Sequence, residues 1–465
     1  MKALSILLIT LLSSFLVTAQ DITGQWNGVL KVQGIQLRVV FNITKTDTGF
    51  TSTMDSPDQG AKGIAVTNTT FDNSKIKFEV TNARIEYNGE LKENEIVGTF
   101  KQAGQEFPMN LSRKAIEKEV VKRSQEPTKP FSYYSEDVTF QNTKANILLA
   151  GTLTLPKKDG NFPVVILITG SGPQNRDGEL FGHKPFLVIS DYLTKNGIAV
   201  LRYDDRGVGN SQGDRKNATS ADYATDVESA IYYLKTRKEI NKNKIGLVGH
   251  SEGGLIAPMV AAKTKDISFI VLLAGTGIQG DKIILLQQEL IAKVNGVSDA
   301  EIKKLIEGSR TLNKLVLNSE DNVNLKADLT HSINETFKND QNAEIPNGLT
   351  KEEFVSMQVN QISSPWMQYF LKFDPATTLE KIKCPVLAVN GEKDLQVPPK
   401  ENLTAIKNAL TKGGNKNVTT KEFPNLNHLF QECKTGSPAE YATIEQTFSP
   451  AVLDEITIWI KQHTK

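Results

Sequence analysis

Two hydrophobic patterns divide the chain. Across residues 20–113, short runs alternate between apolar and polar residues and are separated by Gly, Asn and Asp. Strict alternation is typical of antiparallel strands with one buried face, and we count about eight runs. They predict a small antiparallel all-β domain, either lipocalin-like or a sandwich. The clearest runs are 25–32, 37–43, 75–80 and 96–100.

From about residue 131 the pattern changes to apolar runs that alternate with helical segments. Continuous apolar runs indicate strands buried on both faces, and their alternation with helices predicts parallel βαβ units. We expect two opening strands at 136–141 and 147–155, then strands at 163–169, 198–203, 245–248, 269–274 and 385–389, with a weaker one at 418–423.

Two further segments complete the organisation. Between about residues 278 and 380 no strand pattern occurs, and the apolar residues follow helical spacing. An insertion of about a hundred residues is too long for a loop and predicts a helical cap within the domain 131–465. The charged stretch 114–130, which ends in Pro127-Thr128-Lys129-Pro130, is predicted to be a linker.

Residues 1–19 have the features of a secretory signal peptide. Lys2 precedes an apolar run that ends in Val17-Thr18-Ala19, and the run is too short for a confident membrane span. We therefore expect cleavage of this segment and a secreted or periplasmic mature protein without an integral membrane span.

Composition narrows the classes of partner. The 54 Lys and Arg residues balance 53 Asp and Glu residues, so no electrostatic feature favours nucleic acid or an anionic membrane. No Cys and His residues cluster with the spacing of a zinc site. Cys384 and Cys433, the two cysteines of the sequence, are predicted to lie apart as separate thiols.

The strongest chemical motif is Gly249-His250-Ser251-Glu252-Gly253. It is a G-x-S-x-G pattern between a predicted strand and a helical segment, the context in which a strained turn exposes a nucleophilic serine. The flanking glycines avoid collisions with neighbouring backbone. A tight turn with a capping serine is the structural alternative. Ser251 is therefore the candidate nucleophile.

A serine hydroxyl needs a base. His428 follows the last predicted strand in a polar loop and is the candidate base among five histidines. The others are less suitable: His250 lies inside the turn, His463 in the terminal tail, His331 in the cap, and His183 in a long loop that precedes the nucleophile.

The base must be oriented by a carboxylate. Asp394 directly follows the apolar run 385–389 and is the candidate acid. Glu392 is the nearest rival candidate. Its alternative interpretation is a solvated charge on the loop without a catalytic role.

Acyl transfer also needs hydrogen-bond donors for the oxyanion. The expected donors are the backbone N–H of Glu252, directly after the nucleophile, and the N–H of Ser171 in the glycine-containing loop 170–178. A plain turn is the alternative for this loop. The segment 203–211 lacks the Lys-Ser/Thr pair of a phosphate loop and is predicted to be a structural Asp–Arg turn.

In order along the chain, these motifs resemble the α/β-hydrolase superfamily, and in detail the bacterial secreted carboxylesterases similar to serine-aminopeptidase-like hydrolases. The resemblance implies a Ser251-His428-Asp394 triad, a serine esterase for short acyl groups, no cofactor, and a cap that shapes the acyl pocket. It does not cover residues 21–113. The shared residues are 170–178, 205–211, 249–253, Ser364-Pro365-Trp366-Met367, Phe373-Asp374-Pro375, 391–394 and Asn427-His428.

Two alternatives remain open. A serine aminopeptidase-type peptidase would use the same machinery with an acidic anchor for the substrate amine. A non-catalytic protein would instead bind glycan or lipid through the β-domain, where Trp26 is either a sugar platform or a core residue. The expected partner is a small ester, with acylated carbohydrates among the candidates, and the sequence does not predict the oligomeric state.

Overall fold

The computed structural model describes residues 21–32, 35–59, 61–102, 105–117, 123–339, 345 and 349–465. The predicted signal peptide lies outside the described residues. The chain divides into two compact units, which are described separately: unit 1 comprises Met1–Glu119 with Pro346–Leu349, and unit 2 comprises Val120–Ile345 with Thr350–Lys465.

Unit 1 is an antiparallel sheet whose order is β4-β3-β2-β1-β10-β8-β7-β6-β5, with β9 paired to β8. The described strands are β1 (Gly24–Val32), β2 (Ile35–Thr46), β3 (Gly49–Ser56), β4 (Ala61–Ala65), β5 (Asn68–Asp72), β6 (Lys75–Val80), β7 (Ile85–Lys92), β8 (Glu95–Gln102), β9 (Gln105–Pro108) and β10 (Leu111–Ser112). The predicted all-β fold is confirmed. The strand estimate was low because β9 and β10 are too short to show alternation.

The sheet of unit 1 curls around one core. Phe41 on β2 and Phe78 on β6 stack with ring centroids 4.1 Å apart, although four other strands separate β2 from β6 in the sheet order. Trp26 is 1% exposed in this core and donates its Nε1–H to the Ile22 carbonyl at 2.8 Å. Trp26 is therefore a core residue and not a platform for a sugar.

Unit 2 contains an eight-stranded sheet in the order β11-β12-β14-β13-β15-β16-β17-β18. From β14 to β18 neighbouring strands are parallel, whereas β11, β12 and β14 pair antiparallel. Each predicted strand of this sheet is present. The bounds are β11 (Tyr134–Asn142), β12 (Ile147–Leu155), β13 (Phe162–Ile168), β14 (Ala199–Tyr203), β15 (Ile240–His250), β16 (Ile267–Leu273), β17 (Val386–Gly391) and β18 (Val418–Phe423).

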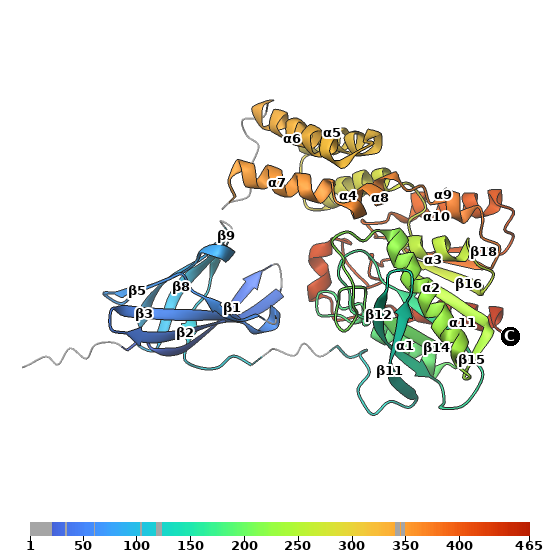
Figure 1. The fold of residues 1–465 in the computed structure, drawn as a ribbon, viewed down its shortest axis with the longest axis horizontal. Coiled ribbons are helices and arrows are strands. Elements are labelled where there is room, and N and C mark those ends of the chain that lie inside the picture. The colour runs from blue at the N-terminus through green and yellow to red at the C-terminus, as the bar shows by residue number, and fades with distance from the viewer. Residues whose placement is uncertain are drawn as a thin grey trace, which may run out of the picture. The chain divides into compact units, whose positions relative to one another are not determined.

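The continuous apolar runs arise because this sheet is buried on both faces. Along β13, Val164 and Ile166 point into one core, while Val165 and Leu167 point into the other. Helices α2 (Ser220–Thr236), α3 (Gly253–Ala261) and α10 (Pro399–Lys412) contribute to the first core, and α1 (Pro185–Lys195) and α11 (Pro450–His463) to the second (Figure 1).

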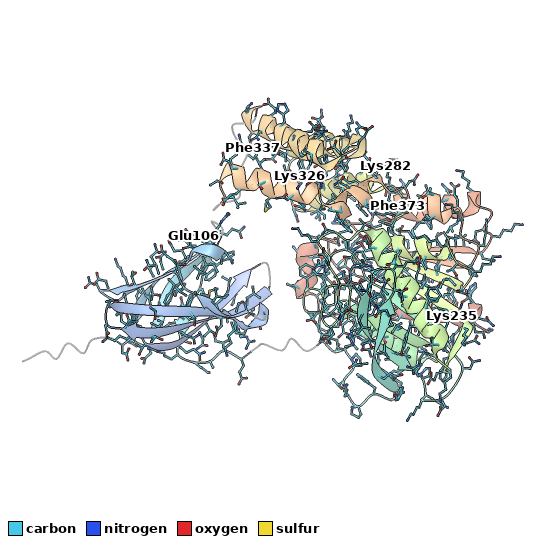
Figure 2. The ribbon with its side chains drawn as sticks, viewed as in Figure 1. Glu106, Lys235, Lys282, Lys326, Phe337 and Phe373 are labelled. Atoms are coloured by element: carbon cyan, nitrogen blue, oxygen red, sulfur yellow. The ribbon has the colours of Figure 1, made fainter. Side chains whose placement is uncertain are left out.

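The long insertion between β16 and β17 is helical. Its helices are α4 (Gly280–Val294), α5 (Asp299–Asn318), α6 (Asn322–Asn339), α7 (Lys351–Ile362), α8 (Pro365–Lys372) and the short α9 (Ala376–Leu379). We call α4 to α8 the cap. It has an apolar cluster of its own, which includes Leu329 and Val355. Phe337 at the end of α6 meets Phe354 on α7 edge to face, with ring centroids 5.8 Å apart (Figure 2).

The predicted linker 114–130 differs from expectation over residues 123–130. Arg123 is 7% exposed and donates hydrogen bonds to the carbonyls of Gly182, Ala442 and Ile444. The Gln125 side-chain Oε1 accepts from the N–H of Thr447 at 2.6 Å. This part of the segment is thus fixed to unit 2. In the part of the chain that the structure describes, no helix is both long and apolar enough to cross a membrane.

Candidate active site

Ser251 occupies a strained turn between β15 and α3. Its φ is +55°, a left-handed conformation that is uncommon for residues other than glycine. Its N–H donates to the Leu273 carbonyl at 2.9 Å, and its carbonyl accepts from the Gly254 N–H at 2.9 Å. A methyl group at Gly253 would lie 2.2 Å from the Ile168 carbonyl oxygen, and one at Gly249 would lie 2.0 Å from the Gly253 oxygen. The two motif glycines therefore permit the turn sterically.

Gly253→Ala is expected to lower the free energy of unfolding by about 1–3 kcal/mol, because the added methyl must displace buried backbone. Urea unfolding measures the change. Gly308→Ala is the matched control, since Gly308 lies within α5 and an added methyl there would have no atom within 4 Å apart from the local helix backbone. That substitution is expected to stabilise the protein by a few tenths to about 1 kcal/mol. Equal effects of the two substitutions would contradict this steric account.

His428 and Asp394 meet directly. The His428 Nδ1 lies 2.8 Å from the Asp394 Oδ2, and the two residues are 5% and 2% exposed. A carboxylate at this distance accepts the Nδ1 proton, which leaves the Nε2 of a neutral ring free to act as a base. The loops that carry the two residues also touch, because a methyl at Gly391 would lie 2.3 Å from the Leu426 carbonyl oxygen.

Asp394 is fixed by its own end of β17. Its Oδ1 accepts from the N–H groups of Gln396 at 2.9 Å and Val397 at 2.8 Å. Its Oδ2 accepts from the Asn390 Nδ2 at 3.2 Å as well as from His428. Asn390 was missed in the sequence, where its only signal is an amide at the end of a buried apolar run. Four donors hold this carboxylate in one orientation.

The rival candidates have other contacts. Glu392 is exposed, and its Oε2 accepts from the Asn425 N–H at 2.8 Å, so it orders the neighbouring loop. His183 is buried, with Nε2 2.9 Å from the Tyr441 carbonyl oxygen. His331 is exposed on α6, and His463 has its Nδ1 2.8 Å from the Trp459 carbonyl oxygen.

His250 connects the serine turn to the histidine loop. Its Nε2–H donates to the His428 carbonyl at 2.9 Å, and the two imidazole rings lie 4.8 Å apart. Loss of hydration, with the nearby His428, lowers the pKa of His250 to about 3. His250 is therefore neutral at physiological pH. Its hydrogen bond to His428 places the turn that carries Ser251 beside the loop of His428.

The loop 170–178 is held by two adjacent aspartates. The Gln174 N–H donates to the Asp205 Oδ2 at 3.0 Å, and the Thr169 hydroxyl donates to its Oδ1 at 2.6 Å. The Arg176 N–H and Nε both donate to the Asp204 Oδ1. Burial raises the pKa of Asp205 to about 7. The backbone of this loop is thus fixed from the end of β14.

The same loop comes close to the nucleophile. A methyl at Gly170 would lie 3.2 Å from the Ser251 Cβ, so the start of the loop is adjacent to the serine. Within the described part of the chain, neither the N–H of Ser171 nor that of Glu252 donates to a protein acceptor. Both N–H groups therefore remain candidates for the predicted oxyanion role.

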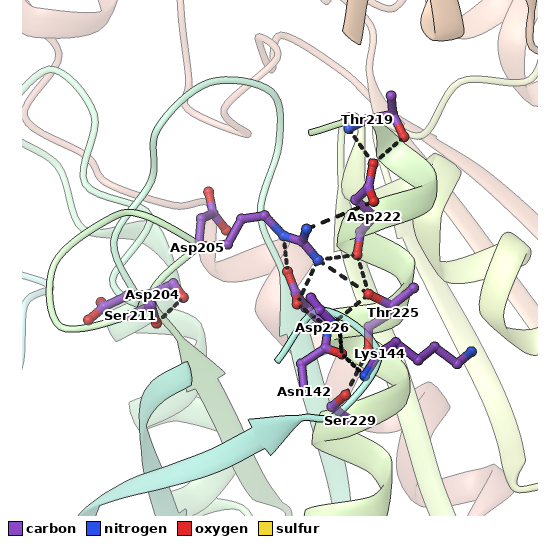
Figure 3. A network of polar contacts seen from close by, with 12 residues as sticks. Asn142, Lys144, Asp204, Asp205, Ser211, Thr219, Asp222, Thr225, Asp226 and Ser229 are labelled. Carbon is purple, nitrogen blue, oxygen red and sulfur yellow. Dashed lines mark hydrogen bonds and ion pairs between the residues drawn. The ribbon is translucent and has the colours of Figure 1, made fainter. Parts of the chain in front are cut away.

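Arg206 has a structural role. Its Nε donates to the Asp226 Oδ2 at 2.8 Å and its Nη2 to the Asp226 Oδ1 at 2.9 Å. Asn142 donates to the same carboxylate at 2.6 Å, which ties β11 to α2. Figure 3 shows the network around the labelled Asn142 and Asp226. These contacts agree with the predicted structural role of the Asp–Arg turn.

Comparisons with known proteins agree with this architecture. Residues 186–341 match the family model described as serine aminopeptidase, S33, and residues 347–452 match that of the prolyl oligopeptidase family. Esterase EstD of Thermotoga maritima is 27% identical over 335 residues, which cover 71% of this chain and 68% of that protein. An uncharacterized 31.7 kDa protein of Escherichia coli is 24% identical over 317 residues, 68% of this chain and 96% of that protein.

A solved structure of the esterase Pf2001 of Pyrococcus furiosus aligns with a TM-score of 0.43 at 18% identity, over 72% of this chain and 92% of that chain. The two family models together cover the strand-turn-helix serine and strands β14 to β18 of the sheet. The chain has the α/β-hydrolase architecture and is a serine hydrolase.

Proposed function

We propose that the chain is a carboxylesterase that hydrolyses short-chain acyl esters through an acyl-enzyme on Ser251. The observation that carries the proposal is the 2.8 Å contact between the His428 Nδ1 and the Asp394 carboxylate beside the serine turn. It gives the imidazole the tautomer in which Nε2 accepts a proton. The name of the relative EstD supports an ester as the substrate.

The proposed reaction has two halves. The His428 Nε2 takes the Ser251 proton as Oγ attacks the ester carbonyl, and it then donates that proton to the departing alcohol. A water molecule, deprotonated by His428, attacks the acyl-serine and releases the acid. Asp394 stabilises the imidazolium that forms in each half.

The oxyanion of each tetrahedral intermediate needs donors in place before it forms. We assign this role to the N–H groups of Glu252 and Ser171. Three features support the assignment: Glu252 follows the nucleophile, Gly170 brings the second loop against Ser251, and both N–H groups lack a protein acceptor within the described residues.

A peptidase is the second candidate, and the descriptions of the two matching family models favour it. Turnover of an aryl acetate and of amino-acid aryl amides by the same enzyme preparation separates the two functions. We expect turnover of the ester, and no amide turnover above that of Ser251→Ala. Acetylated sugars are the next substrates to screen. Faster amide than ester cleavage would favour the peptidase.

We also propose that this activity resides outside the cytosol, because residues 1–19 have the pattern of a secretory signal. Mass spectrometry of the mature N-terminus after expression in a bacterium with a periplasm tests this localisation. Cleavage near Ala19 supports it, and an intact Met1 in the cytosolic fraction contradicts it.

A further inference from the structure

The side chain of Glu252 has contacts that the proposed chemistry does not use. Glu252 directly follows the candidate nucleophile and is 4% exposed. Its Oε1 accepts a hydrogen bond from the Ser220 hydroxyl at 2.6 Å and another from the Trp366 Nε1 at 2.8 Å. Ser220 is the first residue of α2, and Trp366 lies on cap helix α8. One carboxyl oxygen thus joins the nucleophile turn, a core helix and the cap.

The direction of the Trp366 indole is set within the cap. Helix α8 begins at Pro365, and the preceding Ser364 is its N-cap, whose hydroxyl accepts from the Met367 N–H. The Trp366 ring stacks on Phe370 with centroids 5.2 Å apart and planes 7° apart. The indole N–H therefore reaches Glu252 only when α8 is in place.

A buried carboxyl group is costly to leave without donors. Burial raises the pKa of Glu252, and its contacts with Ser220 and Trp366 counteract that shift. Displacement of α8 would remove one of these donors from a group with almost no access to water. The Glu252 carboxyl is therefore sensitive to the position of the cap. The backbone N–H of the same residue is a proposed oxyanion donor.

We propose that Glu252 is a positioning residue that couples the seating of cap helix α8 to the orientation of the oxyanion-binding N–H at residue 252. When Trp366 donates to Glu252, the side chain is fixed at both sides and the peptide of residue 252 is held toward the reacting carbonyl. Without that bond the turn relaxes and stabilises the oxyanion less. This inference rests on the proposed esterase function.

Four single variants and one double variant test the coupling with a short aryl ester. Trp366→Phe removes the donor and keeps the ring, Glu252→Met removes the acceptor, and Glu252→Gln keeps an acceptor oxygen. Trp459→Phe is the matched control, because the Trp459 Nε1 is buried without a partner in the described structure. The double variant combines Glu252→Met with Trp366→Phe.

The expected signature is a loss in kcat with little change in KM, because the oxyanion exists only beyond the ground state. Trp366→Phe and Glu252→Met are each expected to lower kcat about tenfold. The double variant is expected to have the same kcat as the less active of the single variants Trp366→Phe and Glu252→Met, because both substitutions break the same hydrogen bond. Glu252→Gln, which keeps an acceptor oxygen for the Trp366 N–H, is expected to lose less kcat than Glu252→Met, and the control Trp459→Phe is expected to retain kcat near that of the unmodified protein.

Unchanged kcat in Trp366→Phe with a lowered Tm would overturn the inference and leave the bond a purely structural one. Losses that multiply in the double variant would also overturn it, since the two residues would then act separately. If Glu252→Met does not fold, the kcat of Trp366→Phe still tests the inference. If Ser251→Ala retains activity, the proposed function itself fails, whatever the Glu252 variants show.

Discussion

Ser251→Ala is expected to lower kcat for an aryl acetate by about 10⁶-fold, since no nucleophile remains at the turn. The loss should come without unfolding, because the Ser251 backbone bonds to Leu273 and Gly254 do not involve the hydroxyl. Residual turnover should be independent of a serine-directed inhibitor. Steady-state kinetics together with a thermal melt measure both parts of the expectation.

The matched control for this substitution is Ser268→Ala. The Ser268 hydroxyl donates to the Ile245 carbonyl at 2.9 Å near the start of β16, at the opposite end of the strand from Leu273. Its loss should leave kcat nearly unchanged. Full activity in Ser251→Ala, or an equal loss in Ser268→Ala, would remove the basis for assigning the chemistry to Ser251.

Asp394→Asn is expected to lower kcat by about 10⁴-fold. The asparagine oxygen can still accept from the Gln396 and Val397 N–H groups, so the loop keeps its shape. Its amide nitrogen would then face the His428 Nδ1 and favour the tautomer that carries the proton on Nε2. That tautomer cannot accept the proton of Ser251.

Glu392→Gln provides the comparison for Asp394→Asn, because it neutralises the rival acid and keeps an acceptor for the Asn425 N–H. It should retain turnover, as should His331→Ala, which removes an exposed histidine of the cap. A greater loss of kcat in Glu392→Gln than in Asp394→Asn would show that Glu392, and not Asp394, orients the base.

The sheet of unit 2 was predictable because burial on both faces produces continuous apolar runs. Residues such as Val164 and Val165 enter opposite cores, so neither side of the strand needs polar residues. The pairing of Asp394 with His428 could also be predicted, because each follows a predicted strand and the carboxyl ends of these two parallel strands meet at one edge of the sheet. The rival acid Glu392 lies in the same loop, and the sequence distinguishes it from Asp394 only by its position there.

Contacts between distant segments were not predictable from the sequence. Trp366 and Glu252 are 114 residues apart, and nothing local indicates that an indole in the cap meets a carboxyl beside the nucleophile. Arg123 was assigned to a linker from its charged surroundings, yet it bonds to carbonyls more than 300 residues later. Burial of an arginine depends on acceptors that only the tertiary fold supplies.

The most direct measurement is peptide mapping by mass spectrometry after reaction with a fluorophosphonate, which forms a stable bond to an activated serine oxygen as fluoride leaves. We expect one adduct, on the peptide that contains Ser251, with none in Ser251→Ala and much slower formation in Asp394→Asn. An adduct at another serine, or no adduct in a preparation that hydrolyses the aryl ester, would contradict this expectation.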